Sequence, residues 1–419
     1  MIRTDRICIL TLIAVFALII PSVKWLTAVD ELATLVLAGC AMFDCLVNGN
    51  WRRYKLLWVV MGVMTFYAIY SVTMVHYNTP KAVAIDWIIQ LKPFVPMCAA
   101  LAIAPKLTPA DRWWLRIIAV ANIVVALACF FAGDAIMRLV IKHIAHVGIT
   151  IFISAMVYYI CSVRQDGTVP QKDLILTVVF VLSGLVCTRS KYYGTVVFTL
   201  FMLLCYRPGM VKRYGARSLA IFTAVVLIVI KVGWSKFNYY FVNGTSDHFD
   251  PELLSSYARP VMYATSGLIF MDHIPFGSGL ASFGSNASVE PYSGVYHDYQ
   301  IDKVYGISPQ MPEFICDAFY PSLAQFGIAG VALFVYFWIY VVGMLKKVLH
   351  SGVADAAVQY RAAWSLIVFL LIEGIASTTF VQCPGLICMM IIGMICAPVY
   401  NGCAKESGDG CPEPIAVKR

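Results

Sequence analysis

The sequence predicts an all-α polytopic membrane protein with about twelve transmembrane helices and one large periplasmic loop between helices 9 and 10. Composition is the first reason: 60% of the 419 residues are hydrophobic and 13% are charged, whereas soluble domains carry about 25% charged residues. The second reason is that apolar stretches able to span, or nearly span, a ~30 Å hydrocarbon layer recur along the chain. A net charge of +8 on a soluble protein would suggest nucleic-acid binding. Here the charges accompany membrane spans, and we expect no nucleic-acid partner.

Each apolar stretch defines one expected span. The spans lie near residues 7–20, 31–47, 57–76, 84–104, 113–132, 145–163, 174–187, 194–206, 219–234, 321–344, 363–380 and 384–400. The first is not a cleavable signal, because Pro21-Ser22-Val23-Lys24 offers no small-x-small cleavage site. It should stay in the protein as an anchor.

The placement of Lys and Arg predicts the orientation. With the N-terminus in the cytoplasm, 20 of the 31 Lys and Arg residues fall on the cytoplasmic side, as the positive-inside bias favours. An even number of spans then puts both termini inside. The expected organisation is residues 1–234 as helices 1–9, 235–320 as a periplasmic loop domain with short helices, 321–400 as helices 10–12, and 401–419 as a cytoplasmic tail.

The loop at 235–320 is expected to be a small folded domain or an active-site cover, since loops of this length without a role are uncommon. Residues 251–273 have helical spacing, and Asp250-Pro251 is a helix-start pattern. Residues 275–279, Pro-Phe-Gly-Ser-Gly, predict a tight turn, and 285–310 an ordered loop.

Several chemistries are not indicated. The chain has no Walker A sequence, dinucleotide fingerprint or G-x-S-x-G elbow. Most of its 14 cysteines fall inside predicted spans, where Cys behaves as a small hydrophobic residue. Only Cys316 and Cys383 would face the oxidising side, and no spacing fits a zinc site. We expect no metal, no disulfide and no cofactor.

Three cations on the expected outer face run against the charge bias. Arg189 and Lys191 lie in a very short hairpin between two spans, and Arg259 lies on the loop helix. The Arg fork matches phosphate oxygens and Lys adds a point charge, so these sites would clamp a lipid-linked diphosphate. Alternatively, the hairpin cations anchor at lipid headgroups, and Arg259 pairs with Asp250 or Glu252.

Asp317, at the entrance of the tenth span, is the candidate base that would accept a proton from a sugar hydroxyl. The alternatives are a helix cap or a salt bridge with Arg259. His297 and Glu313 are weaker candidates for the same base. Nearby aromatic residues would either stack on sugars or form the loop's own core; they are Tyr292, Tyr296, Tyr299, Tyr305 and Phe319.

Charged residues inside spans are costly and need partners. Lys92 is expected to face the bundle interior near Asp86. Asp44 and Glu373 would belong to a proton relay, as in a transporter, or to buried ion pairs and snorkelling side chains.

The loop and its flanks resemble the bacterial O-antigen polymerase and O-antigen ligase superfamily. The matching pieces are listed in chain order: Thr188-Arg189-Ser190-Lys191, Arg259 with Tyr263, Pro275-Phe276-Gly277-Ser278-Gly279 with Phe283, and residues 317–330, which read D-x-F-Y-x-x-L-x-Q-F-G-I-x-G. Ligases carry a His-Asn pair where this chain has Cys316-Asp317, and this difference favours a repeat-unit polymerase.

The resemblance implies a metal-independent glycosyltransferase of GT-C-like architecture in the bacterial inner membrane, with its active site on the periplasmic side. Arg189 and Arg259 would bind the donor diphosphate and Asp317 would be the base. Substrate-binding candidates are Lys191, Tyr263, His297, Glu313 and Tyr320.

The expected partners are undecaprenyl-diphosphate-linked oligosaccharides and the lipid bilayer, together with a chain-length regulator and a flippase. The product would be a capsule, exopolysaccharide or O-antigen chain. Two other functions stay open: an O-antigen ligase, and a polysaccharide flippase or secondary transporter. A transporter would normally show two related halves, and no such repeat is visible.

Overall fold

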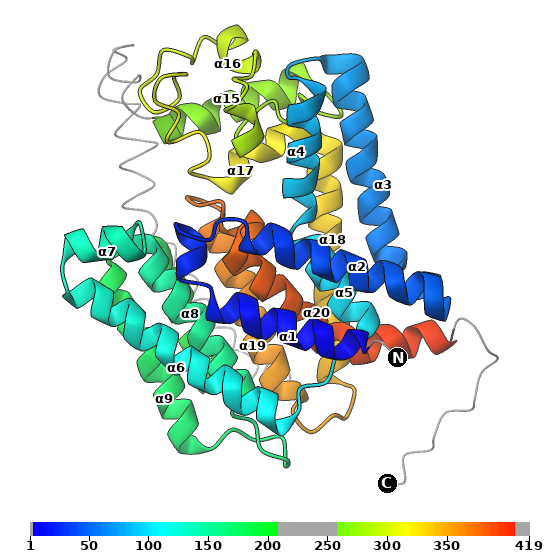
Figure 1. The fold of residues 1–419 in the computed structure, drawn as a ribbon, viewed down its shortest axis with the longest axis vertical. Helices are drawn as coiled ribbons and strands as arrows, with labels where there is room; N and C mark the ends of the chain where they lie inside the picture. Colours follow the sequence, from blue (N-terminus) through cyan, green and yellow to red (C-terminus); the bar gives the residue numbers. More distant parts are fainter. Residues whose placement is uncertain (1–2, 208–257, 407–419) are drawn as a thin grey trace, which may run out of the picture.

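A computed structural model describes residues 3–207 and 258–406, and throughout these ranges every regular element is a helix. The first part contains α1 (Thr4–Ala17), α2 (Val29–Asn48), α3 (Lys55–Tyr70), α4 (Pro80–Leu91), α5 (Phe94–Ile103), α6 (Pro109–Phe131), α7 (Asp134–Val140), α8 (Ile144–Cys161), α9 (Gln171–Ser183) and α10 (Ser190–Leu200). The second contains α15 (Ala258–Asp272), α16 (Val295–Asp298), α17 (Phe319–Ser322), α18 (Gly327–Leu349), α19 (Ala356–Glu373) and α20 (Cys383–Glu406). Figure 1 shows their arrangement.

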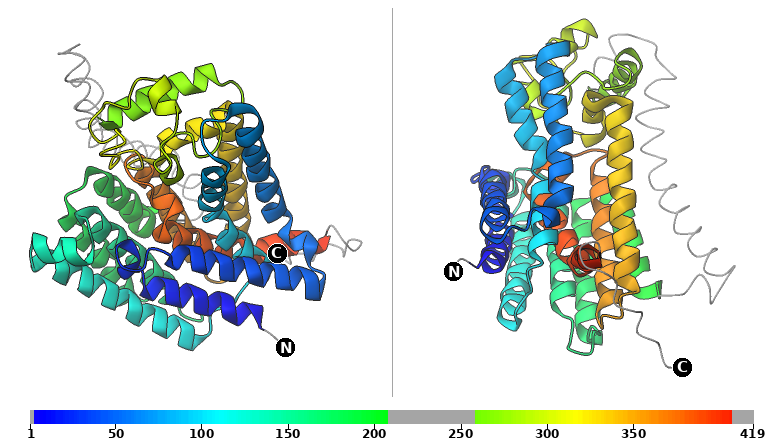
Figure 2. Two further views of the ribbon diagram at one scale, coloured as in Figure 1. Left: turned by 45° about the horizontal axis from the view of Figure 1, so that its top comes forward. Right: turned by 90° about the vertical axis from the view of Figure 1, so that its right-hand side faces the viewer.

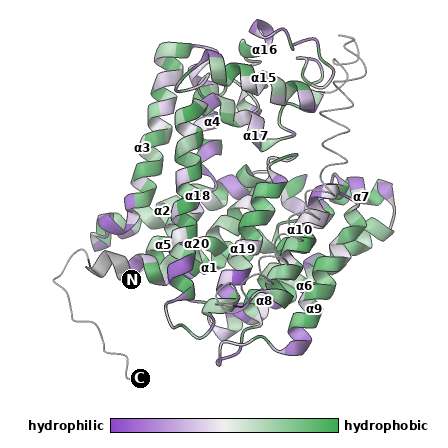
Figure 3. Cartoon of the chain, turned by 180° about the vertical axis from the view of Figure 1, so that it is seen from behind, coloured by the Kyte–Doolittle hydropathy of each residue, from purple (hydrophilic) through white to green (hydrophobic). Residues whose placement is uncertain are grey.

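The described helices are those of a multi-pass membrane protein. Six are long and apolar enough to cross a bilayer, and the bent pair α4–α5 would make a seventh. Hydrophobic residues dominate these helices, whereas hydrophilic residues gather around α15 and α16 and in the turns at the opposite end (Figure 3). The expected span at 219–234 lies outside the described residues. The other expected spans each fall on a helix, but α1 and α10 have only 14 and 11 residues, which is short for a full crossing. The expected number of twelve is therefore not established.

The centre of the bundle is formed by α5, α8 and α20. In α8 and in α20, 78% of an 18-residue apolar stretch is buried inside the protein. Gly393 lets α20 approach α5 closely, because a Cβ there would lie 2.5 Å from the carbonyl oxygen of Met97. Small residues at such crossings are how membrane helices gain close packing. By contrast, α3 and α18 stand side by side at the edge of the bundle (Figures 1 and 2), and most of their residues are not buried.

In the described residues, Lys92 forms ion pairs inside the bundle and Asp44 and Asp86 accept hydrogen bonds, and one predicted partner was wrong. Lys92 contacts Asp30 at 2.9 Å and Glu31 at 2.8 Å, not Asp86. The α4–α5 bend at Lys92 directs its side chain toward α2, while Asp86 lies on the α4 face that meets the loop. Asp44 accepts hydrogen bonds from Asn48, Asn50 and Tyr54 at the end of α2, so it serves a local polar cluster rather than a relay.

The segment 258–320 forms a cap beside the upper ends of α3 and α4 in the view of Figure 1, with an apolar cluster of its own. This cluster includes Met262, Ile269, Phe283, Tyr296 and Ile307. The expected turn at 275–279 is present, with positive φ at Gly277 and Gly279. At Gly277 a Cβ would lie 2.3 Å from backbone atoms of the segment before α18, so only glycine fits this approach.

Hydrogen bonds hold the cap to the bundle. The Oδ2 atom of Asp86 accepts from the backbone N–H of Ala281 at 2.7 Å, and the amide of Asn78 donates to the Ala281 carbonyl at 2.8 Å. A described helix covers Ala258–Asp272 within the predicted 251–273, and the predicted start at Asp250-Pro251 lies outside the described residues. The cap therefore holds α15 and residues 313–320 in fixed positions above the end of the bundle.

Candidate functional site

Arg189 is held at the outer end of a tightly packed hairpin between α9 and α10. Tyr192 fills the inside of this hairpin and donates a hydrogen bond to the Val181 carbonyl at 2.9 Å. Gly184 makes room for the ring, since a Cβ there would lie 2.0 Å from the Tyr192 hydroxyl. Arg189 itself is exposed and immediately precedes α10, whose N-terminal end adds partial positive charge.

His143 contacts Arg189, and the sequence analysis did not identify it. An Nη atom of Arg189 lies 2.9 Å from Nε2 of His143. Because a guanidinium only donates, this ring nitrogen must be the acceptor. Partial burial and the charge of Arg189 lower the pKa of His143, while the carboxylate of Asp317 opposes them. The sequence did offer one signal for His143: it is a histidine in an expected outer turn, directly before a span.

Lys191 is neutralised by a buried partner. Its Nζ atom lies 2.6 Å from Oε2 of Glu373 and 3.2 Å from the Ala376 carbonyl. The Glu373 side chain is only 2% exposed. This pair joins the start of α10 to the end of α19. Of the two roles expected for Glu373, a proton relay or a buried ion pair, the structure shows the ion pair. Lys191 therefore anchors the hairpin beside the candidate site.

Arg259 and Asp317 form an ion pair. This salt bridge is one of the three roles expected for Asp317, beside those of a base and of a helix cap. Each side chain is 29% exposed, so the pair faces solvent in part. One turn after Arg259, Tyr263 donates a hydrogen bond to the Ile375 carbonyl at 2.8 Å. Burial and the nearby Tyr320 raise the pKa of Tyr263, while Arg259 lowers it, so these side chains lie close together.

Residues just after α19 connect the two cationic groups. Tyr263 binds the carbonyl of Ile375 and Lys191 binds the carbonyl of Ala376. The backbone N–H of Phe319, two residues after Asp317, donates to the Gly374 carbonyl at 3.0 Å. The Tyr320 hydroxyl reaches the Leu371 carbonyl. Lys191 and Tyr263, which lie two and four residues after Arg189 and Arg259, therefore bind adjacent carbonyls of one short turn. Asp317 is near enough to affect His143, the partner of Arg189.

Two predicted site residues have other surroundings. His297 pairs with Asp302 at 2.9 Å and contacts the Tyr292 ring within the cap, while Glu313 is exposed on the segment before Asp317. Their contacts do not join them to the arginines. Most of the candidate stacking residues form the loop's core: Tyr296 is fully buried, with Tyr292 and Tyr299 packed around it.

An apolar cavity of about 520 Å³ lies beside the site, between α3 and α18. One end is formed by Phe319, Leu323 and Phe380, and the other by Arg52 and Lys55 at the start of α3. Phe319, two residues after Asp317, lines this cavity, whereas Asp317 and the two arginines are not among its lining residues. Its position at the weakly buried α3–α18 edge suits the apolar tail of a lipid.

Within the ranges 3–207 and 258–406, no group of three His, Cys, Asp or Glu side chains is arranged to hold a metal ion. No protein-family model and no curated protein matches the chain. The site is thus defined by its own geometry: two arginines, an imidazole and a carboxylate at one end of a membrane bundle, next to an apolar cavity.

Proposed function

We propose that this protein is a polysaccharide repeat-unit polymerase, transferring a growing glycan from undecaprenyl diphosphate to a lipid-linked repeat unit. One observation carries the proposal: Arg189 and Arg259 come from separate elements whose neighbouring residues Lys191 and Tyr263 bind adjacent carbonyls of one turn, and a cavity suited to a lipid tail is lined by Phe319 nearby. A lipid-diphosphate glycan needs cations for its diphosphate and an apolar path for its tail. The proposal places the protein in the bacterial inner membrane with the site on the periplasmic side, the side that the Lys and Arg bias predicts for the cap.

The two arginines would stabilise the leaving group. As the sugar's bond to the diphosphate breaks, the electron pair leaves with the diphosphate, and its new charge is stabilised by guanidinium groups already in place. Arg259 is held by Asp317 before substrate arrives. A diphosphate carries more negative charge than one carboxylate, so it would draw Arg259 toward itself and release Asp317.

Asp317 would then act as the base. The hydroxyl oxygen of the acceptor sugar attacks the anomeric carbon of the donor, and its proton passes to the released carboxylate. Because each member of the ion pair is 29% exposed, an acceptor can reach it from the outer side. Tyr263 and Tyr320 would hold the surrounding backbone, since both donate to carbonyls at the end of α19.

Single-turnover transfer in proteoliposomes tests this proposal. The assay uses lipid-diphosphate repeat units in EDTA throughout and compares wild type with Arg189→Ala, Arg259→Ala and Asp317→Ala. Lys303→Ala is the matched control, because Lys303 is an exposed cap cation away from the arginines. We expect ladders of multiple repeats from wild type and the control, and a loss of about 10²- to 10⁴-fold for Asp317→Ala.

Binding of the donor separates the roles of the two partners. Asp317→Asn should bind the lipid diphosphate at least as well as wild type, because Arg259 no longer has a competing carboxylate, yet it should transfer poorly. Arg259→Ala should lose binding and transfer together. Unchanged transfer in all variants, or movement of the intact glycan across the bilayer without ladders, would contradict the proposal and favour a flippase or transporter. Addition of a single glycan to a lipid acceptor would indicate the ligase.

A further inference from the structure

A second cavity, of about 320 Å³, lies at the other end of the bundle from the candidate site. It is lined by α1, by the chain leading into α6, and by parts of α8, α19 and α20. Both α8 and α19 have 18 residues and connect the two ends: α8 begins next to His143 and ends at Cys161 in the cavity wall, whereas α19 begins next to Asp355 and ends at Glu373. A helix of that length spans about 27 Å. The two sites therefore belong to opposite leaflets of a bilayer.

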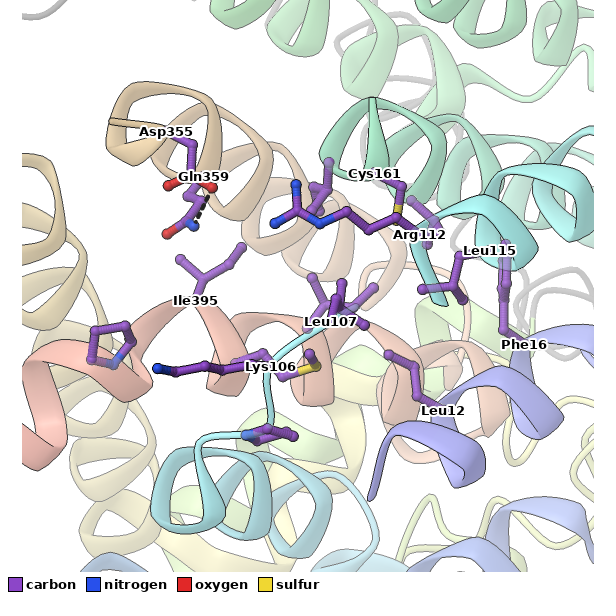
Figure 4. A pocket seen from close by; sticks show the side chains of 16 residues that line it. Leu12, Phe16, Lys106, Leu107, Arg112, Leu115, Cys161, Asp355, Gln359 and Ile395 are labelled. Atoms are coloured by element: carbon purple, nitrogen blue, oxygen red, sulfur yellow. Dashed lines mark hydrogen bonds between the residues drawn. The ribbon is translucent and has the colours of Figure 1, made fainter. Parts of the chain in front are cut away.

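Polar groups of both signs line this cavity. Lys106 and Arg112 supply two positive charges, and Asp355 with Gln359 supplies a negative charge and an amide. In Figure 4 Asp355 and Gln359 lie on one side of Ile395 and Lys106 on the other, and the Arg112 guanidinium points toward the space between them. In the part of the chain that the structure describes, Lys106 has no ion-pair partner, and the closest side-chain bond of Arg112 is a long 3.5 Å contact to the Val163 carbonyl. Asp355 accepts from Gln359 at 2.8 Å and keeps its other oxygen for a further donor.

The remaining wall is apolar. Leu12, Phe16, Leu115 and Ile395 are each buried within the protein and line the cavity. Cations at the end of membrane helices lie at headgroup depth, and a pocket with an apolar wall and a few placed polar groups is the usual form of a small-molecule site. The matching ligand carries a phosphate, a separate positive group and a short apolar stretch.

We propose that this cavity binds the headgroup of a membrane phospholipid that carries a primary ammonium. The phosphate lies with Lys106 and Arg112, the ammonium donates to Asp355 and the Gln359 oxygen, and the first methylenes contact Leu12 and Ile395. Charge complementarity selects this occupant: a glycerol headgroup has no cation for Asp355, and free phosphate makes no use of the apolar wall. The site is independent of the polymerase proposal, since it requires no glycan and lies in the other leaflet.

Native mass spectrometry of the lipid-depleted full-length protein tests the site. The probes are phosphatidylethanolamine, phosphatidylglycerol and diacylglycerol with the same acyl chains, and inorganic phosphate is tested separately by thermal shift. We expect phosphatidylethanolamine to bind at least tenfold more tightly than phosphatidylglycerol. Diacylglycerol and inorganic phosphate should show no saturable binding at this site.

Variants assign the binding to the cavity. Lys106→Gln combined with Arg112→Gln should weaken phosphatidylethanolamine binding by at least tenfold, whereas Asp355→Asn should remove the preference over phosphatidylglycerol. Lys172→Gln is the matched control, because Lys172 is an exposed cation at the start of α9 outside the cavity, and it should bind like wild type. The proposal fails if the double variant binds normally, if Asp355→Asn keeps the preference, or if phosphate alone binds. Should the double variant not fold, the wild-type lipid series and Asp355→Asn still decide the question.

Discussion

At the scale of single residues, Lys191 and Glu373 form a buried ion pair at the end of the bundle. The two charges lie 2.6 Å apart, with side chains 14% and 2% exposed. Removing one partner of such a pair leaves an unpaired buried charge, and this costs about 3–5 kcal/mol. Replacing both partners by apolar residues avoids that penalty.

We therefore expect Lys191→Met to lower the thermal unfolding midpoint strongly, and Lys191→Met combined with Glu373→Leu to recover most of the loss. Thermal unfolding in detergent measures both. Full transfer activity in the double variant would fit an anchoring role for Lys191. If the double variant is stable but does not transfer glycan, the Lys191 ammonium contacts substrate, and its role is not anchoring alone.

The contact between His143 and Arg189 predicts a pH dependence. The pKa of His143 is lowered from 6.5 in the folded protein by partial burial and by the guanidinium, so the unfolded chain takes up this proton first. Stability linked to this residue is then complete above about pH 6.5 and decreases as the pH falls through the lowered value. Protonation also removes the acceptor that Arg189 uses.

Unfolding midpoints between pH 5 and 8 should show this loss in wild type, and His143→Gln should flatten that part of the profile. A variant profile parallel to that of wild type would mean that another group causes the acid sensitivity. The matched control is His297→Gln, since His297 is exposed and pairs with Asp302 within the cap.

At the scale of elements, the hairpin between α9 and α10 depends on two glycines. Gly184 faces the Tyr192 hydroxyl, and Gly148 on α8 faces the Cys187 sulfur, which a Cβ would approach to 2.8 Å. A side chain at either place must displace the hairpin, and Arg189 is attached to it. Close packing of this kind is not visible in hydropathy, which is why the sequence predicted a hairpin but not its fit against α8.

Gly184→Ala should destabilise the protein by about 1–3 kcal/mol through overpacking. It should also lower the rate of glycan transfer, because it moves Arg189. Gly62→Ala is the control: Gly62 lies within α3 with nothing within 4 Å of the added Cβ, so helix propensity alone should raise stability by about 0.5–1 kcal/mol. Thermal unfolding and the transfer assay together check both variants. Equal behaviour of the two would show that the hairpin tolerates the extra methyl group.

The cap shows how far sequence patterns reach at this scale. The tight turn at 275–279 was predicted because Pro and Gly are local signals. The partner of Lys191 was not predicted, since Glu373 lies 182 residues away. The pair of Arg259 with Asp317, 58 residues away, was one of the alternatives that the sequence left open. Contacts at such separations depend on how the helices pack, and hydropathy carries no information about them.

At the scale of the whole molecule, composition was enough to predict an all-helical membrane protein, because a charged fraction of 13% cannot cover a soluble surface. The number of spans was harder to predict. Apolar runs mark helices such as α1 and α9, of 14 and 13 residues, but they do not tell a full crossing from a shorter buried helix. The second cavity was not predicted, because Lys106 and Arg112 are far from Asp355 in the sequence and only folding brings them to one cavity.

The expected orientation of the whole molecule places its two ends on opposite sides of the membrane. The Lys and Arg bias puts the α8–α9 turn in the cytoplasm and the cap outside, and α8 is long enough to separate them by about 27 Å. Lys303→Cys in the cap and Gln165→Cys in the turn place thiols at exposed positions on the two sides. The parent protein for both carries Cys205→Ser, since Cys205 is an exposed native thiol.

A membrane-impermeant maleimide added to intact spheroplasts should label Lys303→Cys at once. Gln165→Cys should react only after the membrane is permeabilised, and the parent protein measures background from the other native cysteines. The result tests the placement of both proposed sites. The diphosphate site must face the side on which the cap is labelled, and the phospholipid site must face the opposite side. Labelling of both cysteines from outside would rule out a crossing by α8, and the reverse pattern would place the arginines in the cytoplasm, where a periplasmic polymerase could not use them.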